Sequence, residues 1–309
     1  MITVNAKVRL LLLPPRGSTF ATRSGVTLVA AAPLVFQPRA FRAALAYDRE
    51  NKLEKGAALA TLCLVSFLVL VFPVFSQDLR PGIIGNDDRV RVDKQGPPWD
   101  AIGQVNISGY RMRGMCTGTL VAPDLVLTAA HCVMDEWKKV PHPLHHIHFL
   151  AGVRGSKNKG HSTAKCLRFV ADYAYIPAPR SPGESLPSAA FTQDVVVIEL
   201  KEKLAVEPAA LAEGLAPQPG LELIQAAYSA DRRYALSAHF ECHLRLINFE
   251  TGLWFTDCDS HPASSGGPFL VQVNDKMKIA ATLSGGDRFT SVGVPISKWL
   301  PLVKGPSCS

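Results

Sequence analysis

Short runs rich in β-branched residues recur between Gly118 and Leu283, and they constrain the fold of this chain more than any other feature. Turn-forming residues separate the runs, and almost no long amphipathic helix interrupts them. Such a pattern is typical of an all-β sandwich or a pair of barrels. The runs are Gly118–Val121, Leu125–Thr128, Val195–Leu200, Leu221–Ile224, Leu244–Phe249, Phe269–Val273 and Ile279–Leu283.

Three further segments complete the expected organisation of this region. Asn274-Asp275 lies between the last two runs and predicts a hairpin turn, because Asn and Asp tolerate the backbone of tight turns. Pro295–Val303 predicts a short closing helix. Pro177–Ser188 is read as an exposed insertion, and Val206–Pro219 as a link between two halves.

The most hydrophobic segment, Gly56–Ser76, carries no charge and follows Lys52 and Lys55. It fits a signal peptide cleaved near Gln77. The alternative is an uncleaved signal anchor, since about 20 apolar residues also span a bilayer. In both cases residues 77–309 are expected on the far side of the membrane. Residues 1–55 show no sustained periodicity and are interpreted as an unstructured extension or a mis-assigned start.

Cysteine usage supports export. Cys63 lies in the leader, and the remaining six form an even set without C-x-x-C spacing. Disulfides in an oxidising compartment are therefore expected, which indicates a secreted or periplasmic protein. The six are Cys116, Cys132, Cys166, Cys242, Cys258 and Cys308.

The formal net charge of +7 is spread over short mixed stretches and forms no basic helix or tail. A nucleic-acid partner would require a clustered basic footprint, so none is expected. We expect contact with a membrane only through an uncleaved leader. We also expect a monomer without a cofactor.

Three motifs carry chemistry, in the order His, Asp, Ser. His131 ends the run Leu127–Cys132, where it is placed rigidly enough to act as a general base. Asp194 leads directly into an apolar run and can hydrogen-bond an imidazole and fix its tautomer. Ser265 lies in Ala263–Pro268, a glycine-containing turn that can present its hydroxyl together with converging backbone N–H groups. This combination predicts a catalytic triad.

These motifs resemble those of trypsin- and chymotrypsin-like serine peptidases. Ile84–Arg89 and Asp257-Cys258-Asp259 are more similar to the bacterial V8-like branch, which is related to glutamyl endopeptidases. The resemblance implies one peptidase domain over residues 77–309. It would consist of two packed six-stranded antiparallel β-barrels with a short C-terminal helix. His131 and Asp194 would come from the first barrel and Ser265 from the second.

The resemblance also implies an oxyanion hole made by the backbone N–H groups of Ala263 and Ser265. The family usually has glycine at the position of Ala263, so the geometry of the hole depends on how Ala263 is accommodated. The family also has aspartate at the position of Ser264, where it pairs with a newly freed N-terminal amine. That activation switch is therefore not expected here.

The substrate-binding residues suggested by the resemblance are Asp259 and the stretch Ser284, Gly285 and Gly286. Asp259 lies six positions before Ser265, where trypsin-like enzymes place the acid that selects Arg or Lys. The alternative is that Asp259 is a plain surface acid. Glutamyl members carry a histidine at the position of Leu283, so selectivity for Glu is not expected.

The cysteines that flank the catalytic loops are expected to pair as Cys116–Cys132 and Cys242–Cys258, each closing a short loop. Cys166 and Cys308 then form a third bridge or stay free.

A separate group of histidines comprises His142, His145, His146 and His148. Histidine pairs can bind zinc, but no nearby acid or cysteine completes a tetrahedral set, and Pro141 and Pro143 indicate a surface loop. No metal site is expected.

The sequence therefore predicts a secreted or periplasmic serine endopeptidase that acts on polypeptide substrates. The alternative is a catalytically inactive homologue that acts as a binding protein.

Overall fold

The computed structural model describes residues 81–108, 112–171, 173–174 and 188–308, all within the compact unit Ser76–Ser309. The interpretations of residues 1–55 and 56–76 lie outside the described residues, as does nearly all of the insertion Pro177–Ser188. No helix among the described residues is long and apolar enough to cross a membrane.

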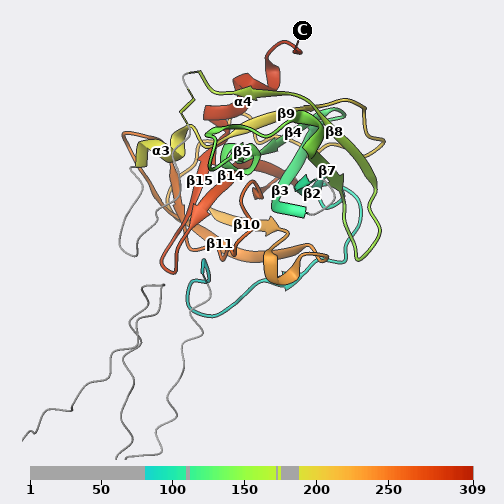
Figure 1. Ribbon diagram of the computed structural model, residues 1–309. Coiled ribbons are helices and arrows are strands. Elements are labelled where there is room, and N and C mark those ends of the chain that lie inside the picture. Colours follow the sequence, from blue (N-terminus) through green and yellow to red (C-terminus); the bar gives the residue numbers. More distant parts are fainter. Residues whose placement is uncertain (1–80, 109–111, 172, 175–187, 309) are drawn as a thin grey trace, which may run out of the picture. The chain divides into compact units, whose positions relative to one another are not determined.

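The first half of the described chain forms a closed six-stranded barrel. Its strands pair in the order β2-β3-β4-β9-β8-β7, every neighbouring pair is antiparallel, and β7 pairs with β2 to close the ring. Figure 1 shows most of these strands in green. They are β2 (Ile102–Ser108), β3 (Met112–Ala122), β4 (Leu125–Thr128), β7 (Ile147–Ala151), β8 (Gly160–Phe169) and β9 (Val196–Leu200).

The second half forms another antiparallel ring, drawn in orange and red in Figure 1. Its order is β11-β10-β13-β14-β15-β12, and β12 pairs again with β11. The two-residue strand β1 (Val90–Arg91) pairs with the edge of β11. The ring strands are β10 (Glu222–Ala227), β11 (Ser237–Ile247), β12 (Trp254–Thr256), β13 (Pro268–Val273), β14 (Lys276–Gly286) and β15 (Ser291–Pro295). The expected two-barrel fold is confirmed.

The turn between β13 and β14 shows why these strands follow the sequence. Asn274 and Asp275 form a two-residue loop with φ of 49° and 59°. Two successive positive φ values are the signature of a type I′ turn, whose twist matches that of paired strands. The predicted hairpin is confirmed.

The two barrels are joined by polar contacts at the base of the catalytic loops. The hydroxyl of Thr117 in β3 accepts the N–H of Tyr228, which follows β10, at 2.9 Å. The Tyr228 hydroxyl returns to the first barrel and donates to the Val153 carbonyl at 3.0 Å. Both side chains are fully buried, so these hydrogen bonds hold the barrels in a defined relation.

The linker Val206–Pro219 runs from one barrel to the other. The Ala209 N–H donates to Leu120 of the first barrel, and the Ala212 N–H donates to Ile279 of the second. The predicted closing helix is α4 (Ile296–Lys304). Arg168 in β8 donates to the Leu302 carbonyl at 3.2 Å, so this helix also contacts the first barrel.

Three disulfides join the six cysteines of the described chain. Cys116 pairs with Cys132, and Cys242 with Cys258, as predicted. Cys166 and Cys308 form the third bridge, which the sequence analysis had left open.

Candidate active site

His131 and Asp194 are brought together by the pairing of β4 with β9. Thr128, at the end of β4, lies opposite Val196, at the start of β9. His131 follows in the 3-10 helix η1 (Ala130–Val133), and Asp194 immediately precedes β9. Two residues from distant parts of the sequence are therefore placed side by side by a single strand register.

Both oxygens of the Asp194 carboxylate bind His131. Nδ1 of His131 lies 2.8 Å from Oδ2, and the His131 backbone N–H donates to Oδ1 at 2.9 Å. A carboxylate at Nδ1 holds the ring proton on that nitrogen and leaves Nε2 as an acceptor. Ring orientation and tautomer are thus both set by Asp194.

The electrostatics of this pair favour the charged forms. Burial lowers the pKa of His131, but the Asp194 charge and hydrogen bond outweigh it, so the pKa is raised above its usual value. Burial raises the pKa of Asp194, yet His131 and the hydrogen bonds to the carboxylate lower it below its usual range. Asp194 therefore stays ionised and stabilises an imidazolium.

Ser284 contributes to this pair rather than to a substrate pocket. It lies in β14 of the second barrel, and its hydroxyl donates a hydrogen bond to Oδ2 of Asp194. The Ser284 side chain is buried, whereas Gly285 is half-buried and Gly286 is exposed at the end of β14. Of these three neighbouring residues, which with Asp259 are the four suggested for substrate binding, only the two glycines are accessible to a ligand.

The loop that carries Ser265 lies beside the Cys116–Cys132 disulfide. The Ser265 carbonyl accepts the Thr117 N–H at 2.9 Å, and Sγ of Cys132 lies 3.9 Å from the same oxygen. Gly266 has a φ of 80°, and a Cβ there would collide with Thr128 Oγ1 and the Thr117 carbonyl. Only glycine allows the serine loop to approach β3 and β4 this closely.

The hydroxyl of Ser265 makes no hydrogen bond to His131 among the described residues. The sulfur of Cys132, which is part of the disulfide with Cys116, lies 3.8 Å from Nε2 of His131. Catalytic hydrogen bonds are often long without substrate and tighten when it binds. The structure places Ser265 on the loop next to His131 without completing the contact.

Ala263 adopts a left-handed backbone conformation, which favours glycine, with a φ of 77°. Its carbonyl accepts the hydroxyl of Thr117 at 3.2 Å, which helps to hold this conformation. Neither the Ala263 nor the Ser265 N–H has an acceptor within the described ranges, whereas Ser264 between them donates to His261. The loop thus presents two unpaired N–H groups, one on each side of Ser264, although Ala263 carries a Cβ that glycine would lack.

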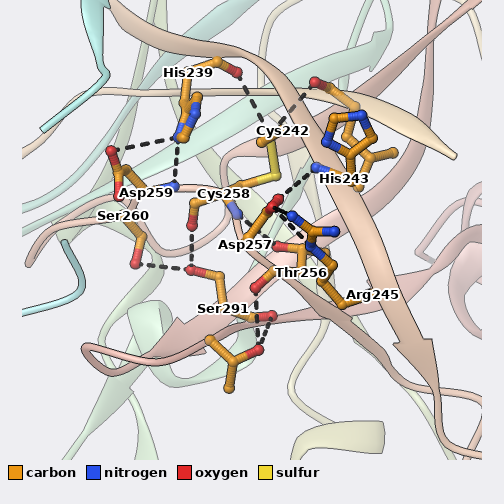
Figure 2. Close-up of a disulfide and its surroundings, with 12 residues drawn as sticks. His239, Cys242, His243, Arg245, Thr256, Asp257, Cys258, Asp259, Ser260 and Ser291 are labelled. Carbon is orange, nitrogen blue, oxygen red and sulfur yellow. Dashed lines mark hydrogen bonds and ion pairs between the residues drawn. A yellow bond between two sulfur atoms is a disulfide. The ribbon is translucent and has the colours of Figure 1, made fainter. Parts of the chain in front are cut away.

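The surroundings of Asp259 differ from both expectations, an acid that selects Arg or Lys and a plain surface acid. It is completely buried, so it is not a surface acid. Its Oδ1 accepts the Ile84 N–H and its Oδ2 the Asp88 N–H, each at 2.8 Å. Figure 2 shows the carboxylate also facing His239, beside the Cys242–Cys258 disulfide. With both oxygens occupied, Asp259 is not available to select a cationic substrate side chain.

The N-terminal segment is held by a second set of charges. Arg89 is buried and pairs with Asp87 and Asp231, each at 2.8 Å. Asp231 also lies 3.3 Å from Nδ1 of His261, in the loop that carries Ser265. Asp87 and Arg89 lie within the segment Ile84–Arg89, whereas Asp231 and His261 are far from it in sequence. No local pattern marked Asp231 or His261 as members of the site.

Among the described residues, three clusters bring together enough potential ligands for a metal ion, but none offers a free set. Two of them contain disulfide sulfurs, which do not act as thiolate ligands. In the third, the Asp259 oxygens accept backbone N–H groups and His239 Nδ1 accepts the Asp259 N–H.

A family model described as Trypsin matches residues 88–244, about half of the chain. The chain belongs to the trypsin family. The matched residues include His131 and Asp194 and end before Ser265. The family and the fold together place this trypsin-family chain among serine peptidases, hydrolases that act on polypeptides.

The trypsin-family fold also agrees with a solved structure described as a Glu endopeptidase in complex with MPD. The TM-score is 0.58 at 19% sequence identity, and the match covers 72% of this chain and 99% of that one. The resemblance of the sequence to the V8-like branch thus has a structural counterpart. At this identity the match supports the fold, not the specificity.

Proposed function

We propose that this trypsin-family chain is an active serine endopeptidase in which Ser265 is the nucleophile. His131 is the general base, and Asp194 orients and stabilises it. The observation that carries the proposal is the double contact of the Asp194 carboxylate with the ring and backbone of His131. That contact prepares Nε2 as a proton acceptor next to the Ser265 loop.

The proposed reaction has two steps, acylation of Ser265 and hydrolysis of the acyl-enzyme. Oγ of Ser265 attacks the carbonyl carbon while Nε2 of His131 takes the hydroxyl proton, and that proton then passes to the leaving amine as the C–N bond breaks. Water attacks the resulting acyl-enzyme ester, with His131 again accepting and returning a proton. The free serine and a carboxylic acid are the products.

The unpaired N–H groups of Ala263 and Ser265 would receive the negative charge that develops on the carbonyl oxygen. A preorganised donor of this kind is worth about 3–4 kcal/mol in the transition state. Because the donors are backbone groups held by the loop, they do not have to reorganise during the reaction.

The substrate side chain before the scissile bond is proposed to be uncharged. A Cβ at Gly286 would lie 2.8 Å from Ser291 Oγ and 3.0 Å from Ser260 Oγ, so these two hydroxyls pack against the glycine. These hydroxyls are buried and lie 3.2 Å from each other. Asp259 is occupied and Leu283 is buried, so neither provides a charge or an imidazole for an ionic side chain.

The three disulfides support the proposal that the domain functions in an oxidising compartment, secreted or periplasmic. N-terminal sequencing of the protein recovered outside the cytoplasm tests this part. A start near Gln77 supports cleavage of the leader, and retention of residues 1–76 in the membrane fraction supports the signal anchor.

A serine-directed fluorophosphonate tests the catalytic assignment. The folded protein should be labelled at Ser265, as mapped by mass spectrometry. The Ser265→Ala variant should not be labelled. Ser264→Ala is the matched control and should still react, because the Ser264 hydroxyl only accepts the His261 N–H. A folded protein that takes no label at Ser265 would instead support the inactive binding homologue.

A further inference from the structure

Two histidines meet on the outer face of the first barrel, away from the residues of the proposed triad. His148 lies in β7 and His161 in β8, where Leu150 pairs with His161 and His148 with Thr163. Ile147 and Phe149 point into the core, so His148 faces outward. Its Nδ1 lies 3.0 Å from Nε2 of His161.

The two rings face each other through nitrogen atoms that are not otherwise engaged. Their planes differ by 12°, and the contact satisfies the geometry of an N–H···N hydrogen bond. In the described part of the chain no carboxylate pairs with either imidazole. Burial lowers the pKa of His148, and the positive charges of His161, His146 and His145 lower it further.

The separation of the nitrogens suits a metal chelate. Two ligands at about 2.0–2.1 Å from one ion, with their nitrogens 3.0 Å apart, subtend an angle of about 90–95°. That angle is close to the right angle of square-planar or octahedral coordination, which Cu²⁺ and Ni²⁺ favour. Tetrahedral Zn²⁺ would require the nitrogens to separate by about 0.3–0.4 Å.

The surroundings contain a further polar atom without a partner. Asn106 in β2 lies directly opposite His148 in β7, and its side chain is nine-tenths buried. Its Oδ1 has no hydrogen-bond partner among the described residues. Opposed residues of an antiparallel pair have Cβ atoms about 5 Å apart, so this oxygen belongs to the same patch of the outer face.

We propose that His148 Nδ1 and His161 Nε2 bind a divalent transition-metal ion on the outer face of the first barrel. Affinity should be higher for Cu²⁺ and Ni²⁺ than for Zn²⁺, and negligible for Mg²⁺. The ion would link β7 to β8 and stabilise the folded state, because the unfolded chain does not hold the two nitrogens together.

His161 explains why the sequence did not reveal this site. It lies outside the segment that holds His142, His145, His146 and His148, and only the strand pairing brings it to His148. Within that segment alone, no acid or cysteine completes a set of metal ligands.

The test uses the full chain without an affinity tag and with Ser265→Ala to prevent self-cleavage. Ni²⁺ is the probe, because a free Cys63 thiol would reduce Cu²⁺. Residues 1–80 contain no histidine and do not compete for the ion. Isothermal titration should give one Ni²⁺ per chain, and saturating Ni²⁺ should raise the Tm, whereas Mg²⁺ should change neither.

His161→Gln is the decisive variant because His161 is exposed and its loss should not disturb folding. It should bind Ni²⁺ at least about tenfold more weakly and lose the rise in Tm. His243→Gln, which removes a half-buried histidine of β11, is the matched control and should bind like the parent. Equal Ni²⁺ affinity in the parent and in His161→Gln would overturn the proposal, as would an equal loss in His243→Gln.

Discussion

Ile84 and Asp259, which are 175 positions apart in the sequence, are joined by a 2.8 Å hydrogen bond from the Ile84 N–H to Oδ1. Ser260, next to Asp259, donates its own N–H to the Gly82 carbonyl at 2.8 Å. The N-terminal segment is thus fastened to the chain just before the serine loop. We call these two hydrogen bonds the clamp, because they hold the N-terminal segment beside the residues that precede the Ser265 loop.

Removing this clamp should weaken the fold. Asp259→Ala removes the buried carboxylate that accepts the Ile84 and Asp88 N–H groups, which should lower the free energy of unfolding by about 2 kcal/mol. Urea unfolding measures the change. Asp93→Ala is the control, because Asp93 and its partner Arg91 are both about two-thirds exposed and such pairs contribute little. A similar small loss in both variants would show that the clamp does not stabilise the protein.

Replacing Asp194 should abolish most turnover while preserving the fold. In Asp194→Asn the imidazole loses its counter-charge and the control of its tautomer. The equivalent Asp-to-Asn change in the Ser-His-Asp triad of chymotrypsin-like enzymes lowers turnover about ten-thousand-fold. A fall in kcat of at least about a thousand-fold is therefore expected here. Hydrolysis at saturating substrate and neutral pH measures it, with circular dichroism as the check on folding.

In the parent, activity should increase with pH as His131 loses its proton. Asp194 raises the pKa of His131, so the increase should be centred above the usual value of about 6.5.

Ser284→Ala is the comparison variant for Asp194→Asn, since it removes only the hydrogen bond to Asp194 and should retain far more activity than Asp194→Asn. If Asp194→Asn kept more than about a tenth of parental turnover, Asp194 would not be the orienting acid.

Ala263→Gly should stabilise the protein. Alanine at a φ of 77° carries a steric cost of about 1–2 kcal/mol that glycine avoids, partly offset by the greater chain entropy of glycine when unfolded. A net gain of about 1 kcal/mol in urea unfolding is expected, with kcat changed only slightly. Ala210→Gly, at an exposed residue without a positive φ, should instead destabilise the protein. A loss of stability in Ala263→Gly would mean that the left-handed backbone is not a source of strain.

Stability toward acid should depend on Glu199. Hydrogen bonds from Arg168, then from Lys165, lower the pKa of this buried carboxyl from 4.5 to about 2. A depressed folded pKa stabilises the protein above about pH 4.5, and the contribution is lost as the pH falls toward 2. The parent should therefore exceed Glu199→Gln in free energy of unfolding at pH 6, with the difference shrinking at pH 3.5.

Glu213→Gln provides the control for that comparison, because Glu213 and Lys304 are both about half exposed. Its effect should be small at both pH values. A difference between parent and Glu199→Gln that did not change with pH would argue against ionisation of Glu199 as the cause.

The barrels were predictable because short runs rich in β-branched residues recur between residues suited to turns. Strand ends were less predictable. β11 begins at Ser237 rather than Leu244, and its first part contains Glu241 at a φ of 57°, where the register with β10 is also irregular. An interrupted alternation of polar and apolar residues hides such a strand from a reading of periodicity.

The proximity of His131 and Asp194 could be inferred because each residue adjoins an apolar strand, and the two strands pair. The position of Asp259 could not. Its spacing from Ser265 says how far apart the residues are along the chain, but not toward which partner the carboxylate turns. That direction depends on the N–H groups of Ile84 and Asp88, which are 175 and 171 positions away in the sequence.

The disulfide between Cys166 and Cys308 has a consequence for the timing of synthesis. Its two cysteines are 142 positions apart, whereas those of each other bridge are 16 apart. As the chain emerges from its N-terminus, the shorter bridges can close while later residues are still being added. Cys166 has to wait for 142 further residues before its partner exists. During that interval its thiol is open to exchange with the wrong cysteine, so the yield of correctly bridged protein should depend on a compartment that can reshuffle disulfides.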